Sequence, residues 1–322
     1  MRIAFIGGFS NLYDEEGKAK TFELLGAEVL RIEESSFTGK TIELILKWGP
    51  DILMSPKYKI NNQLREELFS SCRREGILIC SWHPDLYHYP YLMPNQNRFA
   101  EITNKIGLWS SDVVFSPEGG EHSDAFYSKC GIKQYTVRQA PYHETVGISN
   151  IEDISDITTK EVPLLFVGTA YTNGDGFRQF LLKFLEEQYG EKFMLMGHTA
   201  EHQVRESRLS SLIAQSKIII GESTYFPGYW SNRLYESIGR GGFTLHPYVA
   251  GIEDEFVDGE ECVYFSRWNF KELKEKIDYY LDEPEERNRI INNGLARVKK
   301  DHTLINRCTQ VLEIINELRN TR

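Results

Sequence analysis

The residues with the clearest chemical meaning lie between positions 228 and 247, in the segment GYWSNRLYESIGRGGFTLHP. Its pattern predicts a polar turn, a helix over residues 231–240, a glycine pair and a buried strand over residues 243–245. Ser231 and Asn232 are residue types that cap helix N-termini, and Arg233 would lie in the first turn. Backbone N–H groups, the positive end of the helix dipole and a guanidinium would then meet at one point, which suits a diphosphate.

Glu236 follows Arg233 by three residues, about one helical turn along the same face. A carboxylate at that position can accept hydrogen bonds from two neighbouring sugar hydroxyls. A diphosphate site with a diol acceptor beside it is the arrangement that a nucleotide sugar requires. The segment therefore predicts a nucleotide-sugar site.

Further candidates follow other predicted strands of the second half. The segment FVGTAYTNGDGFR predicts a strand that ends at Gly168, a glycine-rich loop, and Arg178 at the start of a helix. Ligands of parallel α/β sheets bind beyond the carboxyl ends of the strands. Arg178 is accordingly a second candidate phosphate contact, or an ordinary solvated arginine. His198, Gly251 and Ile252 follow later strands and could face the ligand, although His198 is equally a plain loop histidine.

Polar residues also follow the predicted strands of the first half. His83 and Asp85 come after the apolar run at residues 77–82, where a histidine or carboxylate could act as general base toward an acceptor hydroxyl. A metal site at this pair is the weaker alternative, since no third ligand is evident. Gly8 lies in a Gly-Gly turn that lets the backbone approach a ligand, or simply closes a tight turn. Four residues after the strand at 112–116 are alternative bases: Glu118, Glu121, His122 and Asp124.

The chain of 322 residues is long enough for two domains. Strand and helix patterns alternate in both halves, which predicts a doubly wound parallel sheet in each. The predicted division is a first domain at residues 1–150, a linker at 151–162 and a second domain at 163–301. Residues 302–322 form a terminal helix. Its predicted apolar stripe consists of Ile305, Cys308, Val311, Leu312 and Ile315.

The composition favours an ordinary globular protein of the cytoplasm. Charged residues make up 26% of the chain and apolar residues 41%. No apolar run approaches the roughly 20 residues of a membrane span, and no secretory leader pattern follows Met1. The five cysteines show no CxxC spacing, so neither a disulfide framework nor a structural metal is predicted. The net charge of −10 disfavours nucleic acid as a partner.

From residue 164 to residue 315 the sequence resembles the group 1 glycosyltransferases of GT-B architecture, with the spore maturation protein CgeB as the nearest branch. The matching series begins with FVGT and the later Arg178, and continues with SNRLYESIGRGG. GIEDEF, DGEE and VYF follow in the same order, and a helix-rich tail ends the series. The first half matches only in pattern, through the Gly-Gly turn and the strand that ends in WHPD.

The resemblance implies a GT-B fold: two Rossmann-like domains that face each other across a cleft, with a C-terminal helix that returns to the N-terminal domain. It implies that Glu236 binds the ribose hydroxyls, that Ser231, Asn232 and Arg233 hold the diphosphate, and that Gly251 to Glu253 lie near the donor sugar. It also implies that no cofactor and no bound metal are needed. One departure is that Gly228 occupies the position of a second glutamate found in many relatives. Retention and inversion therefore both stay open.

Three functions fit these residues. The first is a transferase that moves a sugar from a nucleotide diphosphate to the hydroxyl of a glycan, a protein or a small molecule, with modified nucleic acid less favoured. The second is a nucleotide-sugar epimerase or hydrolase of the same fold. The third is a non-catalytic two-domain binding protein. An oxidoreductase is the least favoured, because neither half contains GxGxxG followed by an acidic residue.

Overall fold

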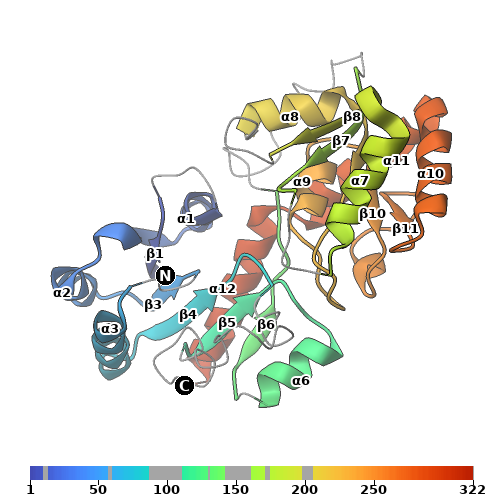
Figure 1. Ribbon diagram of the computed structural model, residues 1–322. Helices are drawn as coiled ribbons and strands as arrows, with labels where there is room; N and C mark the ends of the chain where they lie inside the picture. The colour runs from blue at the N-terminus through green and yellow to red at the C-terminus, as the bar shows by residue number, and fades with distance from the viewer. Residues whose placement is uncertain are drawn as a thin grey trace. The chain divides into compact units, whose positions relative to one another are not determined.

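The structure, a computed structural model, describes residues 1–9, 14–56, 60–86, 111–129, 131–141, 161–170, 175–197 and 206–321. The chain forms two compact units (Figure 1). The first combines Met1–Arg138 with Leu304–Arg322, and the second is Gln139–Thr303. Most of the predicted linker lies outside the described residues, so its bounds stay a prediction.

The first unit contains a six-stranded sheet in the order β2-β1-β3-β4-β5-β6, and every neighbouring pair is parallel. The strands are β1 (Arg2–Gly7), β2 (Glu28–Glu33), β3 (Ile52–Ser55), β4 (Leu78–Trp82), β5 (Val113–Ser116) and β6 (Gln134–Thr136). The helices of this part of the chain are α1 (Asp14–Leu24), α2 (Gly39–Trp48), α3 (Asn62–Arg74), α6 (Glu121–Lys129) and α12 (Leu304–Asn320), with a short 3₁₀ helix at Glu34–Ser36. Strands buried on both faces explain the continuous apolar runs of the sequence.

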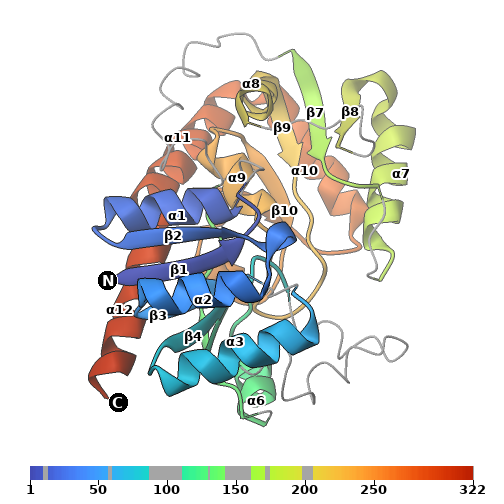
Figure 2. The ribbon, with the colours of Figure 1, turned by 90° about the vertical axis from the view of Figure 1, so that its left-hand side faces the viewer.

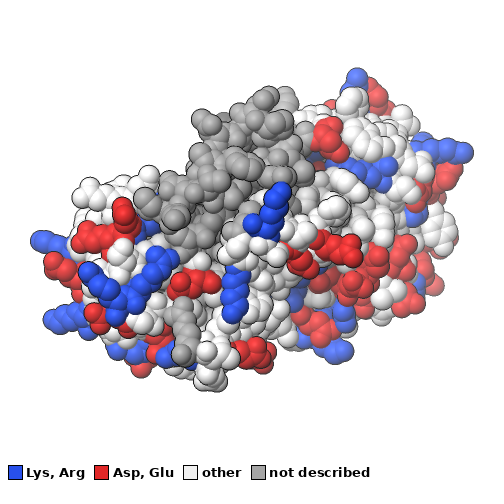
Figure 3. Space-filling model, turned by 90° about the horizontal axis from the view of Figure 1, so that it is seen from below, with Lys and Arg blue, Asp and Glu red and all other residues white. Residues whose placement is uncertain are grey.

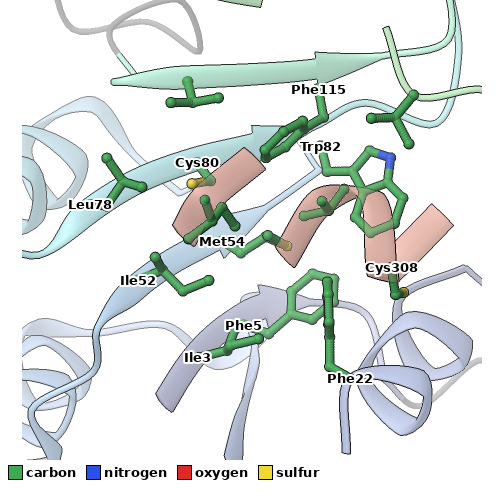
Figure 4. Packing of buried hydrophobic residues seen from close by; sticks show 14 of the residues in the cluster. Ile3, Phe5, Phe22, Ile52, Met54, Leu78, Cys80, Trp82, Phe115 and Cys308 are labelled. Atoms are coloured by element: carbon green, nitrogen blue, oxygen red, sulfur yellow. The ribbon is translucent and has the colours of Figure 1, made fainter. Parts of the chain in front are cut away.

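Alternate residues of these strands face two separate helical layers, because successive strand side chains point to opposite faces. Phe5, Met54 and Trp82 belong to a cluster that also contains residues of α1 and α12 (Figure 4). Ile6 and Leu53 belong to the opposite cluster, with residues of α2 and α3. Figure 2 shows α1 and α2 with the sheet of this unit. The sheet is therefore covered on both faces.

The terminal helix α12 contacts α1 and completes the core of the first unit, as predicted for the last helix. Its buried stripe begins at Leu304 and includes Cys308, Val311 and Ile315. Ile305, which the predicted stripe included, is 40% exposed. The prediction placed the start of the stripe one residue too late, because both residues are apolar and consecutive in the sequence, although they lie on different faces of the helix.

The second unit contains a five-stranded parallel sheet in the order β11-β10-β9-β7-β8. The strands are β7 (Val162–Val167), β8 (Phe193–Met196), β9 (Ser216–Ile220), β10 (Thr244–Pro247) and β11 (Val263–Phe265). The helices are α7 (Phe177–Tyr189), α8 (Glu206–Gln215), α9 (Arg233–Gly239), α10 (Phe270–Asp282) and α11 (Pro284–Asp301), with 3₁₀ turns at Gly190–Lys192 and Ile252–Asp254. Residues of α7 and α10 cover one face, and residues of α8 cover part of the other.

The two sheets share one strand order, which fixes where each can bind a ligand. In both, the strand order reverses between the first and third strands of the unit, β1 and β3 in one and β7 and β9 in the other. Open parallel sheets bind ligands beyond the carboxyl ends of the strands at this switch point. In the second unit those ends lead into Gly168 and Glu222.

We expect Ile315→Ala to destabilise the first unit by about 2–5 kcal/mol, since it removes a fully buried side chain from the core that α12 completes. The matched control is Ile305→Ala on the same helix, which should change the free energy of unfolding by less than about 0.5 kcal/mol. Equilibrium urea denaturation followed by circular dichroism measures both. Equal effects of the two variants would contradict the packing of α12.

Candidate functional site

Gly168 allows an arginine to lie against the backbone at the switch point of the second sheet. It follows β7 with a φ of 155°, and its N–H donates to the carbonyl of Met196 at 2.8 Å. A Cβ atom at this position would overlap Nη2 of Arg233. The absence of a side chain therefore makes room for the guanidinium beside the end of β7.

Arg233 is held by carbonyl groups from the ends of two neighbouring strands. Its Nε donates to the carbonyl of Val167 at 2.7 Å, and its Nη1 donates to the carbonyl of Glu222. Nη1 also lies 3.7 Å from Oε2 of Glu222, and the guanidinium carbon lies 4.9 Å from the ring centre of Phe166. The side chain is 18% exposed, so the cation is fixed in place and still reaches the surface.

Arg178 makes a much closer pair with the same carboxylate. Its Nε and Nη2 both lie 2.6 Å from Oε2 of Glu222, and its Nη1 donates to the carbonyl and hydroxyl oxygens of Thr169 at 3.2 and 3.1 Å. The side chain of Glu222 is 1% exposed. A buried carboxylate is stable only when it is paired in this way. Two strand-end loops and the start of α7 are thus joined by one buried ion pair.

The start of α9 differs from the sequence prediction. The helix begins at Arg233, and Asn232 precedes it in a helical conformation without a side-chain cap. The Ser231 hydroxyl instead donates to the carbonyl of Glu222 at 3.2 Å. The predicted side-chain caps are therefore wrong. The Ser231 hydroxyl has another acceptor, which competes with capping, and the backbone of Asn232 is already helical, whereas a capping residue has an extended backbone.

Glu236 lies on the first turn of α9 and is fixed by an arginine one turn further on. Its Oε2 accepts from Nε of Arg240 at 2.6 Å, and its Oε1 accepts from Nδ2 of Asn232 at 3.3 Å. Arg240 is buried and also donates to the hydroxyl of Ser210. A carboxylate oxygen can accept more than one hydrogen bond, and a carboxylate has about four acceptor positions in all.

A buried neutral histidine lies next to the arginine pair. A Cβ atom at Gly221 would lie 2.6 Å from Cδ2 of His246, so the backbone after β9 packs directly on the imidazole. Burial lowers the pKa of His246 to about 3, with smaller contributions from Arg233 and Arg267, against a backbone hydrogen bond with Pro247 that raises it. The ring is therefore uncharged at neutral pH, and the cationic character of the site comes from the arginines.

Gly251 and Ile252 lie beside the turn that contains Gly228. Gly228 and Gly251 adopt φ values of 72° and 94°, and the N–H of Gly228 donates to the carbonyl of Ala250 at 3.1 Å. The N–H of Gly251 donates to Oε2 of Glu253 at 3.0 Å, while the Ile252 N–H donates to the carbonyl of Val249 at 3.0 Å. In this structure both amides are thus engaged within the protein, and their predicted contact with a ligand stays a prediction.

In the first unit, His83 and Asp85 lie at the carboxyl end of β4 in different environments. His83 is buried and its Nδ1 lies 2.7 Å from the carbonyl of Pro56, beyond the end of β3. Asp85 is exposed, and its Oδ1 accepts from the N–H of Leu86 at 2.9 Å. Gly8 follows β1, and a Cβ atom there would meet nothing within 4 Å. The structure thus places His83 and Gly8 beyond the ends of central strands.

The alternative base candidates of the first unit separate into buried and surface residues. Glu118 is fully buried and accepts a hydrogen bond from the hydroxyl of Tyr127. Glu121 and Asp124 are exposed on α6. His198 of the second half lies outside the described residues.

Sequence reasoning missed Glu222, the residue on which both arginines converge. It lies two residues after the end of the apolar strand β9, and a place just beyond a strand end is what pointed to several other candidates. Arg240, four residues after Glu236, was missed as well, although this spacing is typical of helical ion pairs. Among the described residues, no group of three or more His, Cys, Asp or Glu side chains could hold a metal ion.

Comparisons with known proteins concern the fold of the chain and the sequence of its second unit. Residues 178–313 match a family described as glycosyl transferase-like. A glycosyltransferase structure from Rickettsia africae is 15% identical, with a TM-score of 0.69 over 100% of this chain and 99% of that one. An alpha-glucosyltransferase in complex with UDP-glucose and DNA containing an abasic site is 14% identical, with a TM-score of 0.68 over 98% and 99%. The search of curated proteins found no significant match.

A third similar structure is that of Anabaena HepE in complex with UDP-glucose, at 9% identity and a TM-score of 0.65 over 98% of this chain and 100% of that one. At such identities the structural similarity establishes the fold. The family match covers the segment that carries Arg178, Glu222, Arg233 and Glu236. The two findings together identify the chain as an enzyme of the glycosyltransferase class with the GT-B fold.

Proposed function

We propose that the chain transfers a sugar from a nucleoside-diphosphate sugar to an acceptor hydroxyl. The observation that carries the proposal is the cationic site at the switch point of the second sheet, with Glu236 one helical turn beyond Arg233. This site offers charge for a diphosphate and a carboxylate for a ribose diol. The family match on the same segment supports the assignment.

Arg233 is the main diphosphate contact in this proposal. Glycosyl transfer breaks the bond between the anomeric carbon and a diphosphate oxygen, and that oxygen keeps the electron pair. A fixed guanidinium at this position stabilises the developing charge without reorganisation. We therefore propose that the reaction requires no metal ion.

The predicted acceptor base remains His83 or Asp85, and the hydrogen bonding of His83 supports it as the stronger candidate. A backbone carbonyl only accepts hydrogen bonds, so Nδ1 of His83 carries the proton in its contact with Pro56. Nε2 is then the basic nitrogen of the neutral ring. Asp85 keeps its carboxylate on the surface. A base of this kind is required only if the transfer inverts the anomeric configuration.

Relatives of known structure suggest where to begin with the donor and the acceptor. Two of the similar structures contain UDP-glucose, which makes it the first donor to test.

The ordered series of motifs from residue 164 onward supports a place in the CgeB-like branch. On the face in Figure 3, basic side chains are interspersed with acidic ones and form no continuous basic surface among the described residues. The net charge of the chain is −10, so we favour a glycan, protein or small-molecule acceptor over nucleic acid.

A cytoplasmic location is part of the same proposal. Cys72, Cys80, Cys262 and Cys308 are unpaired buried thiols, as a reducing compartment favours. No helix in the described part of the chain combines the length and the apolar character needed to cross a membrane.

We expect the purified chain to consume a nucleotide sugar faster when an acceptor is added, and to retain this activity in excess EDTA. Release of nucleoside diphosphate from UDP-glucose and from a panel of other donors, measured with and without candidate acceptors, provides the test. Complete loss of activity in EDTA, with recovery on addition of Mg²⁺ or Mn²⁺, would contradict the metal-independent mechanism. Acceptor-independent consumption of the donor would instead indicate the hydrolase or epimerase.

We expect wild type to bind a nucleoside diphosphate more tightly than its 2′,3′-dideoxy analogue, which lacks the ribose hydroxyls. Glu236→Gln should reduce this ratio of affinities by about tenfold or more, since hydrogen bonds to charged groups contribute about 1.5–3 kcal/mol each. The substitution keeps an acceptor for the buried Arg240, which Ala would leave without its carboxylate partner. The ligand is whichever of UDP, ADP, GDP and CDP most raises the melting temperature of the wild-type chain. Isothermal titration then compares it with its 2′,3′-dideoxy analogue.

The control for this comparison is Glu187→Gln, which neutralises a glutamate that is 61% exposed on α7 and should leave the preference unchanged. Arg233→Ala should weaken binding of the nucleoside diphosphate and leave the affinity for the corresponding nucleoside unchanged. Equal discrimination by the wild-type chain and Glu236→Gln would show that Glu236 does not contact the ribose.

A further inference from the structure

Glu222 has a geometry that the proposed function does not explain. An acidic side chain is unfavourable in a site for a diphosphate, yet this carboxylate is buried at its centre. Its Oε2 faces both arginines, while its Oε1 has no hydrogen-bond partner among the described residues. The residue therefore accepts fewer hydrogen bonds than a buried carboxylate normally requires.

The two arginines are held by this carboxylate to different degrees. Arg178 has two nitrogen atoms at 2.6 Å from Oε2, and its third nitrogen contacts Thr169. Arg233 has one nitrogen at 3.7 Å from the same oxygen and is bound mainly by backbone carbonyls. The side chain of Arg178 is 10% exposed and that of Arg233 is 18% exposed. Arg178 is thus the fixed partner, and Arg233 is the one that an incoming anion can reach.

We propose that Glu222 is the internal counter-ion of the diphosphate site. Arg178 is a positioning residue that holds this carboxylate in place, and the carboxylate lowers the affinity of Arg233 for nucleoside diphosphates, which favours product release. This inference rests on the proposed function. The product carries one more negative charge than the diphosphate of the donor, because the departing oxygen keeps the electron pair of the broken bond. Repulsion from Glu222 therefore acts more strongly on the product than on the donor.

The proposal predicts a gain of affinity, which a purely structural role of Glu222 would not produce. Glu222→Gln should bind inorganic pyrophosphate and the nucleoside diphosphate selected above about tenfold or more tightly, since one nearby like charge is removed from a partly buried site. Product inhibition should strengthen in parallel, and kcat should fall where release of the product limits turnover. Isothermal titration and steady-state kinetics provide the readouts.

Glu187→Gln is the matched control, because it removes the same charge from the surface of the same unit. Its affinity for pyrophosphate should stay within about twofold of wild type, since exposed charges are screened by salt. Unchanged or weaker pyrophosphate binding by folded Glu222→Gln would overturn the proposal.

A second variant tests the same proposal if Glu222→Gln does not fold. The double variant Arg178→Met with Glu222→Gln replaces the buried ion pair by neutral side chains of similar size, a change that proteins often tolerate. If Arg178 only positions Glu222, this variant should bind pyrophosphate at least as tightly as wild type. Binding that is tenfold weaker would instead make Arg178 a direct phosphate contact and overturn its positioning role.

Failure of this inference can be distinguished from failure of the proposed function. A wild-type chain that binds neither pyrophosphate nor any of the four nucleoside diphosphates contradicts the donor site itself. A wild-type chain that binds them, with variants that show no gain, contradicts only the role of Glu222.

Discussion

The buried ion pair between Arg178 and Glu222 is the interaction on which the rest of the candidate site depends. It joins the start of α7 to the loop after β9, and the same carboxylate and its backbone carbonyl face Arg233 at the start of α9. Removing one partner of such a pair leaves an uncompensated buried charge, which is strongly destabilising. Three elements that are separated in the sequence are thereby held together at the carboxyl-terminal edge of the sheet.

The topology of the sheet explains why these elements meet. In a parallel sheet all carboxyl ends lie at one edge, and connections on either side of the switch point diverge to leave space there. Gly168 and Gly221 then permit close approach, the first to the guanidinium of Arg233 and the second to the ring of His246. The site is thus built from short loops on rigid strands, which restricts how far its charges can move.

Much of the fold could be predicted from the sequence because its central parallel strands, such as β3, β4 and β5, are buried and appear as continuous apolar runs. The apolar run at residues 77–82 forms β4 and the strand predicted at residues 112–116 is β5, each with one end shifted by a single residue. Local sequence patterns gave wrong details where two neighbouring residues had similar polarity and either could take the same structural role. Examples are the buried stripe of α12, which begins at Leu304, and the start of α9, where Ser231 contacts a carbonyl instead of capping the helix.

The site itself was predicted only in part, for a physical reason. Arg178 and Arg233 were identified by type and by position at the start of a helix, but the residue that joins them lies 44 positions from Arg178. No local pattern encodes a contact at that separation, and the sheet order that creates it had to be known first. Glu236 was found because its chemistry depends on the helix on which it lies, whereas its partner Arg240 was read only as the end of that helix.

The most direct test of the central claim is a crystal structure of the chain with the nucleoside diphosphate that it binds most tightly. The account predicts that the diphosphate lies within hydrogen-bond distance of Arg233, beyond the ends of β7 and β9, and that the ribose hydroxyls contact Glu236. A nucleotide bound elsewhere, with Arg233 and Glu236 unchanged in their contacts, would contradict it.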